Sequence, residues 1–260
     1  MKKVLVLMGL AIASVATPVA QARPDVSKNL VSPGTLTVGT DAPYAPFEFG
    51  DPPHYRGFDI DLVNALARKL DLKVKIVDRP YSTLIPRLRL GGFDLIASAM
   101  SITPQRRRQV SFMKANFDST QSIMVRRGSG IRSVRDLAGL TIGAQDGTTG
   151  EWFAIDRTPA RKVLGYPSGA ATVAALKNGQ VAAVILDEPI ARQVMRGGVR
   201  GLKIAKSFSV GNKYAYAVKK PNNRLRKGLN WAFGKVKADG TFRRIYRRWF
   251  GMNPPPSLRR

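Results

Sequence analysis

The sequence has no cysteine, and only one of its 260 residues is a histidine. Without cysteine the chain cannot form a disulfide, use a thiol nucleophile or bind a metal through sulfur. It also lacks the residue on which a bacterial lipid anchor is built. His54 lies in the proline-rich turn Asp51–Tyr55, and one loop histidine cannot form a histidine cluster around a metal. We therefore expect a solvated His54 and a protein that works without a metal or another cofactor.

Long hydrophobic runs are also missing. The apolar run Val4–Ala16 is shorter than the roughly 20 residues that cross a bilayer, and nothing later is long and apolar enough. Lys2 and Lys3 precede this run and Ala20-Gln21-Ala22 follows it, which is the composition of a secretory signal peptide. The sequence predicts a signal peptide over residues 1–22, cleavage before Arg23 and a periplasmic location.

Acidic residues are few: 17 Asp and Glu stand against 43 Lys and Arg, a formal net charge of +26. Nucleic-acid binding would explain such a charge, but the export signal and the lack of a compact basic helix with interleaved aromatic residues argue against it. The basic residues are spread over helices and gather at Arg106–Arg108 and in the tail from Arg243 to Arg260. This indicates a solvated basic surface and no nucleic-acid partner. Adaptation to an acidic or anionic compartment is a hypothesis for the charge.

From Thr35 onward, short β-like runs alternate with helical patterns, which is typical of an α/β fold with a mostly parallel sheet. In the helix predicted over 58–70, apolar residues line one face, and Asp59 and Asp61 favour the first turn electrostatically. A first β-α-β-α-β unit consists of strands at 35–39, 73–77 and 94–97 and helices at 58–70 and 83–90.

The same alternation restarts after the glycine-rich stretch 126–130. The second unit consists of helices at 134–137, 151–156, 170–177 and 189–195 and strands at 141–144, 162–165 and 182–186. The remaining segments, an alternating run at 213–218 and helices at 222–237 and 241–250, are too short to fold alone. We expect them to return to the first unit through crossovers near 116–120 and 210–214.

These patterns predict two doubly wound α/β lobes that are joined by a two-strand hinge and close around a ligand in the cleft. The first lobe is expected to be discontinuous, with residues 23–117 and 214–260. The second lobe is expected to hold residues 118–213.

The segment Gly57–Leu70, GFDIDLVNALARKL, matches the signature of the family 3 solute-binding proteins, which bind polar amino acids. Further blocks agree with that family in order and spacing: Val38–Asp41, Pro46–Phe49, Tyr81–Pro86, Ser98–Thr103 with Arg106, Gln145–Thr149, Ile185–Pro189, and Ala238–Phe242 ahead of Trp249–Gly251. The chain thus resembles this family from about Thr35 to Gly251. The resemblance implies the periplasmic binding protein type II fold, a monomer, an amino-acid ligand and the permease of an ABC importer as partner.

A free amino acid presents a carboxylate, an ammonium and a side chain, so its site needs a planar cation, a carboxylate and a shaped pocket. The resemblance implies that Arg106 binds the ligand carboxylate, for which a guanidinium fork is suited, while Arg107 and Arg108 point elsewhere. Taken without the resemblance, any one of the three arginines would be an ordinary solvated residue.

The loop Gly147–Gly150 precedes a predicted helix and resembles an anion cradle, in which Thr149 helps to hold the same carboxylate. Simple N-capping by a threonine is the alternative, and both can hold at once. The resemblance also implies a donor from Ser101, and backbone carbonyls of Ser98 and Ala99 that accept from the ligand ammonium.

Asp187 follows an apolar strand, at the carboxyl edge where α/β sheets place ligands. In the family this aspartate pairs with the α-ammonium of the ligand. Alone it could equally cap the helix that begins near Pro189. Tyr44 and Tyr81 match the two aromatic positions that sandwich the ligand side chain, whereas the bare sequence would place both in ordinary packing.

Asp41 matches the aspartate that family members specific for glutamine or for cationic amino acids direct at the ligand side chain. Gln145 and Leu186 depart from the glutamine type, which has a lysine and a histidine there. The loop Asp146–Thr149 is closer to the cationic type, although Ala99 replaces a serine of that type. The resemblance therefore implies a cationic or amide amino acid, and it implies that an acidic one is repelled.

An enzyme is the main alternative, because the same fold includes the cyclohexadienyl dehydratases, which eliminate water and carbon dioxide. That chemistry needs a general acid over the ligand. Asp41 and Asp187 could be proposed for it, but no extra acid is evident in the cleft motifs, so we expect a binding protein and no enzyme. The sensor domain of a receptor, a second alternative, would need a membrane segment.

Overall fold

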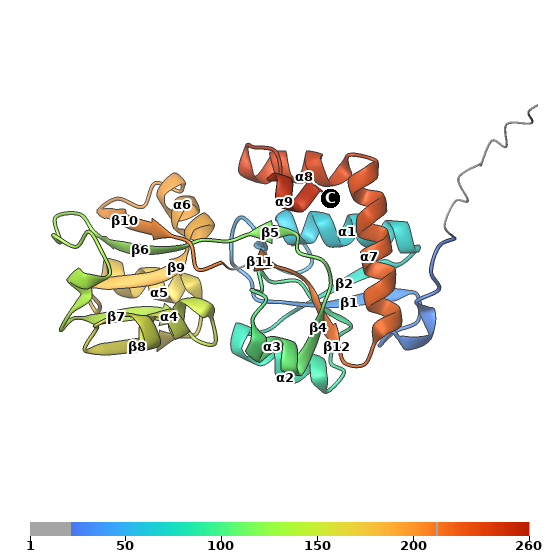
Figure 1. Ribbon diagram of the computed structural model, residues 1–260, viewed down its shortest axis with the longest axis horizontal. Coiled ribbons are helices and arrows are strands. Elements are labelled where there is room, and N and C mark those ends of the chain that lie inside the picture. The colour runs from blue at the N-terminus through green and yellow to red at the C-terminus, as the bar shows by residue number, and fades with distance from the viewer. Residues whose placement is uncertain (1–21, 212, 260) are drawn as a thin grey trace, which may run out of the picture.

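The computed structural model describes residues 22–211 and 213–259. All of the predicted signal peptide except Ala22 lies outside the described residues. The chain forms two α/β bodies that lie end to end and are joined by extended segments (Figure 1). No helix among the described residues is long and apolar enough to cross a membrane.

The first lobe is the body built on a five-stranded sheet with the order β2-β1-β3-β12-β4. Its strands are β1 (Thr35–Thr40), β2 (Lys73–Asp78), β3 (Leu95–Ile96), β4 (Val110–Phe112) and β12 (Ala217–Lys219). Its helices are α1 (Phe58–Leu70), α2 (Tyr81–Arg89), α3 (Pro104–Gln109), α7 (Asn223–Ala238), α8 (Thr241–Phe250) and α9 (Pro256–Arg259), with a 3₁₀ turn at Ser27–Asn29. Helices α1 and α8 lie on one side of the sheet, and α2 and α3 lie on the other (Figure 1).

The second lobe is the body built on a sheet with the order β10-β6-β9-β7-β8. Its strands are β6 (Gln121–Arg126), β7 (Thr141–Gln145), β8 (Lys162–Tyr166), β9 (Ala183–Asp187) and β10 (Leu202–Phe208). Its helices are α4 (Thr149–Arg157), α5 (Gly169–Lys177) and α6 (Glu188–Arg196), and the segment Arg135–Leu137 is a 3₁₀ turn where a helix was expected.

In each sheet four strands run in the same direction and one runs against them, so the sheets are mixed but mostly parallel, as expected. The strands of the predicted β-α-β units are parallel, as in β1 with β2 and β3, and β7 with β8 and β9. The strands next to the crossovers run the other way: β6 is antiparallel to β9 and β10, and β12 is antiparallel to β3 and β4. Parallel neighbours need a connecting helix that returns the chain to the same end of the sheet. A strand that directly follows a crossover between the lobes has no such helix before it, so it can run antiparallel to its neighbours.

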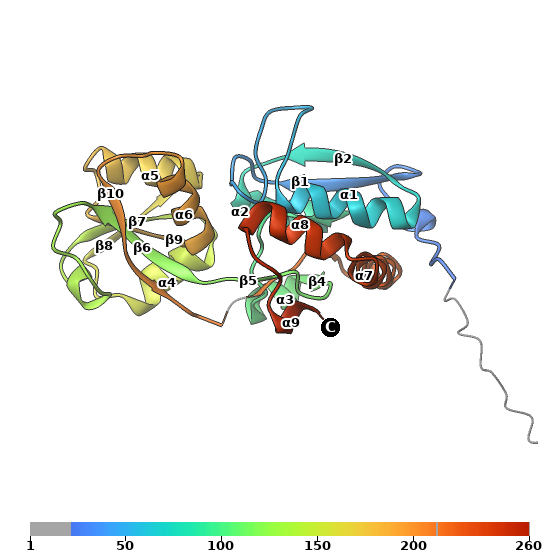
Figure 2. The same ribbon diagram turned by 90° about the horizontal axis from the view of Figure 1, so that it is seen from above.

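The hinge is a two-stranded antiparallel pair, β5 (Phe117–Asp118) with β11 (Lys213–Tyr214), at the two predicted crossovers. Lys213 Nζ and Asp118 Oδ1 lie 2.6 Å apart across it. Ser119 Oγ donates to Tyr214 Oη at 2.7 Å, which ties the two segments together where they leave the first lobe. In the view from above, an extended segment joins β5 to β6 between the two bodies (Figure 2).

An aromatic cluster fixes this hinge to the core of the first lobe. The ring of Phe117 lies 5.0 Å from that of Phe47, 5.5 Å from that of Tyr214 and 4.7 Å from that of Phe250. Phe58, at the start of α1, contacts Phe47 and Phe250 at 5.9 and 5.0 Å. Edge-to-face and offset rings of this kind add to the free energy of burial. The hinge strand β5 therefore belongs to the packing of the first lobe.

Gly57 joins the loop after β1 to helix α1. Its φ of 135° disfavours an L side chain, and an added Cβ would lie 2.1 Å from the carbonyl oxygen of Phe47. The same carbonyl accepts from the N–H of Asp59 at 2.9 Å, and the carbonyl of Pro46 accepts from that of Phe58. The loop thus satisfies the first N–H groups of α1, which have no acceptor within the helix. Only glycine permits this approach.

We expect Gly57→Ala to lower the free energy of unfolding by about 1–3 kcal/mol, because the new Cβ collides with backbone and φ is strained. The matched control is Gly234→Ala in α7, where an added Cβ meets nothing within 4 Å. This variant should gain up to about 1 kcal/mol from helix propensity. Urea unfolding of both variants checks the pair, and equal stabilities would contradict the role of Gly57.

Candidate functional site

The residues predicted to bind a ligand lie where the two lobes face each other. From the first lobe come Asp41 and Tyr44 after β1, Tyr81 at the start of α2, Ser98, Ala99 and Ser101 after β3, and Arg106 in α3. From the second lobe come Gln145 at the end of β7, Thr149 at the start of α4 and Asp187 at the end of β9. Hydrogen bonds between the lobes connect several of them.

Arg106 lies between the lobes and is buried, with 3% of its surface exposed. Helix α3 places it there because Thr103 caps the helix, its hydroxyl accepting from the N–H of Arg106, and Pro104 follows. Its two terminal nitrogens donate to the carbonyl of Ser101 at 2.8 Å and to that of Gly147, in the second lobe, at 2.9 Å. Arg107 and Arg108 are exposed, as predicted.

The rings of Tyr81 and Trp152 flank the guanidinium of Arg106, with centroids 5.4 and 5.0 Å from its central carbon. Both attract a cation through their π-faces. Neither neutralises it, and among the described residues Arg106 forms no ion pair. A buried cation without a counter-ion is costly, so this position favours an anion.

The start of α4 shows which threonine caps the helix. Thr148 is the N-cap, and its hydroxyl accepts from the N–H of Glu151 at 3.1 Å, while Glu151 accepts from the N–H of Gly147 at 2.8 Å. These bonds leave the N–H groups of Thr149 and Gly150 without an acceptor, since residues at a helix start have none within the helix. The hydroxyl of Thr149 lies 3.3 Å from that of Ser101 in the first lobe. Thr148 therefore caps the helix, and Thr149 faces the cleft.

Asp187 does not cap α6, since its side chain accepts no hydrogen bond from that helix. Its carboxylate accepts from the hydroxyl of Tyr44 at 2.8 Å, across the cleft, and from the side-chain amide of Gln121. Burial raises its pKa above the usual aspartate range, while the tyrosine bonds and the charge of Arg106 oppose this shift. The capping alternative is thus wrong for Asp187.

Asp41 accepts from the side-chain amide of Gln145 at 2.6 Å, and this bond also crosses the cleft. Burial raises the pKa of Asp41 to about 6, and the charge of Asp78 acts in the same direction. The carboxylate is therefore mostly ionised at neutral pH and protonates just below it. Among the described residues it forms no ion pair.

Ser98 and Ala99 form the floor of the cleft beside Asp41. The hydroxyl of Ser98 accepts from the N–H of Asp41 at 3.1 Å and donates to Glu48 at 2.7 Å. Ala99 has a φ of 42°, which is rare for a residue with a side chain, and its N–H donates to Asp59 at 2.9 Å. Two buried acidic residues therefore hold this segment from behind.

Sequence reasoning missed Gln121 and Trp152. Gln121 begins β6, a strand that was not predicted, and it is 1% exposed; its amide nitrogen also lies 3.4 Å from Thr149 Oγ1. Its side-chain oxygen is buried without a hydrogen-bond partner in the described residues and borders the cleft. The register Gln121↔Asp187 across β6 and β9 could have pointed to it, had β6 been recognised.

Little space remains between the lobes in this closed arrangement. The cavity bordered by Tyr44, Gln121, Gln145 and Asp187 has a volume of about 10 Å³, room for about one water molecule. A Cβ added at Gly169, on the other side of the cleft, would lie 3.1 Å from the ring of Tyr44, so no side chain fits between them. A larger ligand can enter only if the lobes separate.

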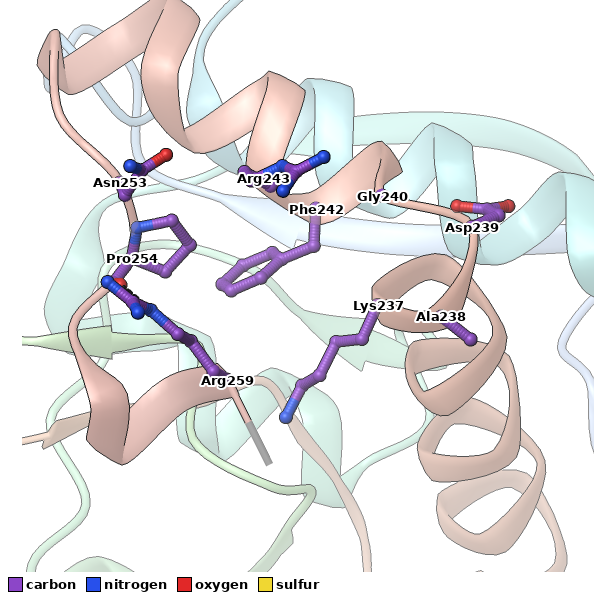
Figure 3. Close-up of a pocket in the computed structure, with 9 residues that line it drawn as sticks. All are labelled: Lys237, Ala238, Asp239, Gly240, Phe242, Arg243, Asn253, Pro254 and Arg259. Atoms are coloured by element: carbon purple, nitrogen blue, oxygen red, sulfur yellow. Dashed lines mark hydrogen bonds between the residues drawn. The ribbon is translucent and has the colours of Figure 1, made fainter.

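A larger hollow, of about 410 Å³, lies on the first lobe outside this site (Figure 3). It is lined by residues of α7, α8 and the C-terminal segment: Lys237, Ala238, Asp239, Gly240, Phe242, Arg243, Asn253, Pro254 and Arg259. Its carboxylate, Asp239, pairs with Lys69 at 2.7 Å. None of the predicted ligand-binding residues lines it. Among the described residues no cluster of metal-ligating side chains occurs either.

Comparisons with known proteins find relatives over most of the chain. The family model "Bacterial extracellular solute-binding proteins, family 3" matches residues 36–252. The putative ABC transporter arginine-binding protein 2 of Escherichia coli (strain K12) is 31% identical over 221 residues, which cover 83% of this chain and 90% of that protein.

Two solved structures are similar over most of the chain. An ancestral arginine-binding protein bound to arginine has 37% sequence identity and a TM-score of 0.79, and the match covers 84% of this chain and 99% of that one. An ancestral amino acid-binding protein, described as a precursor of cyclohexadienyl dehydratase, has 33% identity and a TM-score of 0.76, with 84% and 95% covered.

Proposed function

The chain belongs to the bacterial extracellular solute-binding proteins of family 3, and from this premise we propose that it captures a polar L-amino acid between its lobes for an ABC importer. The observation that carries the proposal is the set of buried charges in the cleft. Arg106 is a cation, Asp41 and Asp187 are anions, and none of the three forms an ion pair among the described residues. Buried charges without counter-ions favour a ligand that supplies them.

The carboxylate of the ligand would bind Arg106 and the start of α4. Two N–H groups of Arg106 donate to backbone carbonyls, which leaves three of the five guanidinium donors. The N–H groups of Thr149 and Gly150 point from the same helix end, where the helix dipole favours an anion. The hydroxyl of Ser101 lies beside Thr149 and would add a further donor.

The ammonium of the ligand would bind Asp187 and the backbone carbonyls of Ser98 and Ala99. Asp187 follows β9 in the second lobe, and the two carbonyls follow β3 in the first, so the ammonium would bridge the lobes. An ammonium has three donors in a compact head, and these acceptors would satisfy them. In the arrangement without ligand, the hydroxyl of Tyr44 donates to this carboxylate, and the ammonium would take the place of that donor.

The side chain of the ligand would extend toward Asp41 and Gln145, between Tyr44 and Tyr81. With Asp187 taken up by the ammonium and Arg106 by the carboxylate, the charge of Asp41 remains for the side chain. A cationic side chain would neutralise it, whereas an amide would exchange hydrogen bonds with Asp41 and Gln145. The charge balance favours an arginine, lysine or ornithine ligand over glutamine.

Binding would take place by closure of the two lobes about β5 and β11. The contacts proposed for the ligand come from both lobes, and a cavity of about 10 Å³ admits no amino acid in the closed arrangement. The ligand would enter between separated lobes and replace the direct bonds Tyr44–Asp187 and Asp41–Gln145. A ligand with contacts on both lobes favours the closed state.

The cellular part of the proposal follows the family. We propose export by the signal peptide over residues 1–22, a periplasmic monomer, and an ABC permease as partner, with residues 23–117 and 214–260 as the first lobe and 118–213 as the second. A binding role is favoured over dehydratase chemistry, since the similar precursor of a dehydratase is itself described as an amino acid-binding protein.

Calorimetric titration tests the ligand class. Arginine, lysine, ornithine, histidine and glutamine should bind, and glutamate should bind more weakly than all of them. Unit charges about 4 Å apart interact by about 4 kcal/mol at an effective dielectric near 20, and desolvation reduces this value. Tighter binding of glutamate than of the others would show that Asp41 does not contact the ligand side chain.

Arg106→Ala should lower the affinity for arginine by about a hundredfold or more, because loss of a charged partner in a closed cleft costs on the order of 3 kcal/mol. Arg107→Ala is the matched control, since it removes an exposed arginine from the same helix turn. Its affinity should equal that of the wild type. Unchanged affinity in Arg106→Ala would place the carboxylate site elsewhere.

The affinity for arginine should fall about tenfold between pH 7 and pH 5, because Asp41, with a pKa of about 6 in the unliganded protein, loses its charge over this range. Asp41→Asn should bind arginine weakly and without this pH dependence. The measurement is a series of calorimetric titrations in buffers of constant ionic strength. Parallel profiles for the two proteins would rule out Asp41 as the group responsible.

A further inference from the structure

The side chains of two acidic residues interact in the core of the first lobe, directly behind Ser98 and Ala99, to which they are bonded. Glu48 belongs to the loop after β1 and is fully buried; Asp59 belongs to the first turn of α1 and is 1% exposed. Neither forms an ion pair among the described residues. Two carboxylates without a cation repel each other in a low dielectric, so the pair is expected to retain a proton.

Within residues 22–211 and 213–259, no cation contacts the pair to replace that proton. The titratable groups that face the pair are Asp41 from the loop after β1, Tyr81 from α2 and Tyr216 from the segment before β12. The segment after β3 contributes only the hydroxyl of Ser98 and the N–H of Ala99. All of these groups are neutral or acidic.

The hydrogen bonds indicate which carboxyl carries the proton. Both oxygens of Asp59 accept, one from the N–H of Ala99 at 2.9 Å and the other from the hydroxyl of Tyr216 at 2.9 Å. Glu48 accepts from Ser98 at 2.7 Å through Oε1, and its Oε2 is buried without a donor. A proton on Oε2 that is directed at Asp59 satisfies this oxygen, since a protonated carboxyl is a donor.

Burial raises the pKa of Glu48 well above the usual glutamate range, and the nearby Asp59 adds to this shift. Burial also raises the pKa of Asp59, to about 6, while the bonds from Ala99 and Tyr216 oppose the shift. Both directions are consistent with an ionised Asp59 and a protonated Glu48 at neutral pH.

We propose that Glu48 is a protonated acid at neutral pH, that it donates to Asp59, and that this pair positions the Ser98–Ala99 floor of the cleft. The part of the proposal that concerns the ligand rests on the proposed function; the protonation of Glu48 does not. Glu48 orients the Ser98 hydroxyl, which in turn accepts from the N–H of Asp41. Asp59 holds Ala99 at its unusual φ of 42°. The pair thus acts through the floor and does not touch the ligand.

Amide substitutions distinguish the two acids. In Glu48→Gln, the amide oxygen still accepts from Ser98 and the NH₂ group donates to Asp59, as the proposed carboxyl does. Affinity for arginine should stay within about threefold of the wild type. In Asp59→Asn, the NH₂ group must face one of the two donors, Ala99 N–H or Tyr216 Oη, so affinity should fall on the order of tenfold or more. Equal losses in both variants would overturn the assignment.

The pH profile of unfolding gives a readout that packing alone does not change. Above pH 6.5 the unfolded wild type has lost the proton of Glu48, whereas the native state keeps it, so wild-type stability falls as pH rises. In Glu48→Gln the side chain at this position has no proton to release, so this fall in stability with pH is absent. The ratio of the wild-type to the variant unfolding constant should rise about tenfold per pH unit, from pH 6.5 until the native pKa of Glu48 is reached. Asp51→Asn, an exposed change of the same charge in the same loop, is the control and should follow the wild type.

These unfolding measurements need no ligand, so they stand if arginine does not bind. If Glu48→Gln does not fold, carbon-13 NMR of the wild type decides the question, because the chain has three glutamates, Glu48, Glu151 and Glu188. One of the three carboxyl carbons should have the shift of a protonated acid at pH 7 and persist in Glu151→Gln and in Glu188→Gln. Three ionised carboxylates at pH 7, or unfolding ratios that do not change with pH, would overturn the proposal.

Discussion

The buried charge of Arg106 is the constraint on which the cleft depends. Its guanidinium donates to a carbonyl of each lobe and lies between two aromatic rings, so the closed arrangement is organised around a cation that nothing in the described protein neutralises. Backbone dipoles and π-faces stabilise a cation only in part. An arrangement of this kind fits an anionic group that comes from outside, and the carboxylate of the proposed ligand is such a group.

The interior and the surface of the protein carry opposite charge patterns. The chain as a whole is strongly basic, yet the groups within and behind the cleft are mostly acidic: Asp41, Glu48, Asp59 and Asp187. Exposed lysines and arginines are screened by salt over about 8–10 Å, whereas buried carboxyls act at contact distance. Under the proposed function, selectivity would therefore depend on the carboxylates that face the ligand, Asp41 and Asp187, more than on the basic surface.

Patterns that depend on local sequence predicted the fold well. The apolar face and acidic start of Phe58–Leu70 predicted α1 at its observed bounds, and the family motifs led to residues that meet across the cleft. We missed strands β4, β6 and β10, because their pairing is decided by partners distant in sequence. The short helix α3 was also missed. Gln121 was missed with β6. Glu48 and Asp59 were also passed over, since only the structure brings a loop and a helix start into contact.

The position of β12 has a consequence for how the chain acquires its structure. This strand lies between β3 and β4, so the central sheet of the first lobe stays open until residue 219 is available. All five strands of the second lobe have been synthesised once residue 208 is available. A polypeptide that emerges from its N-terminus can therefore finish the inserted body first. The first lobe, which contains the first described residues, can be completed only later, because β12 has to insert between β3 and β4.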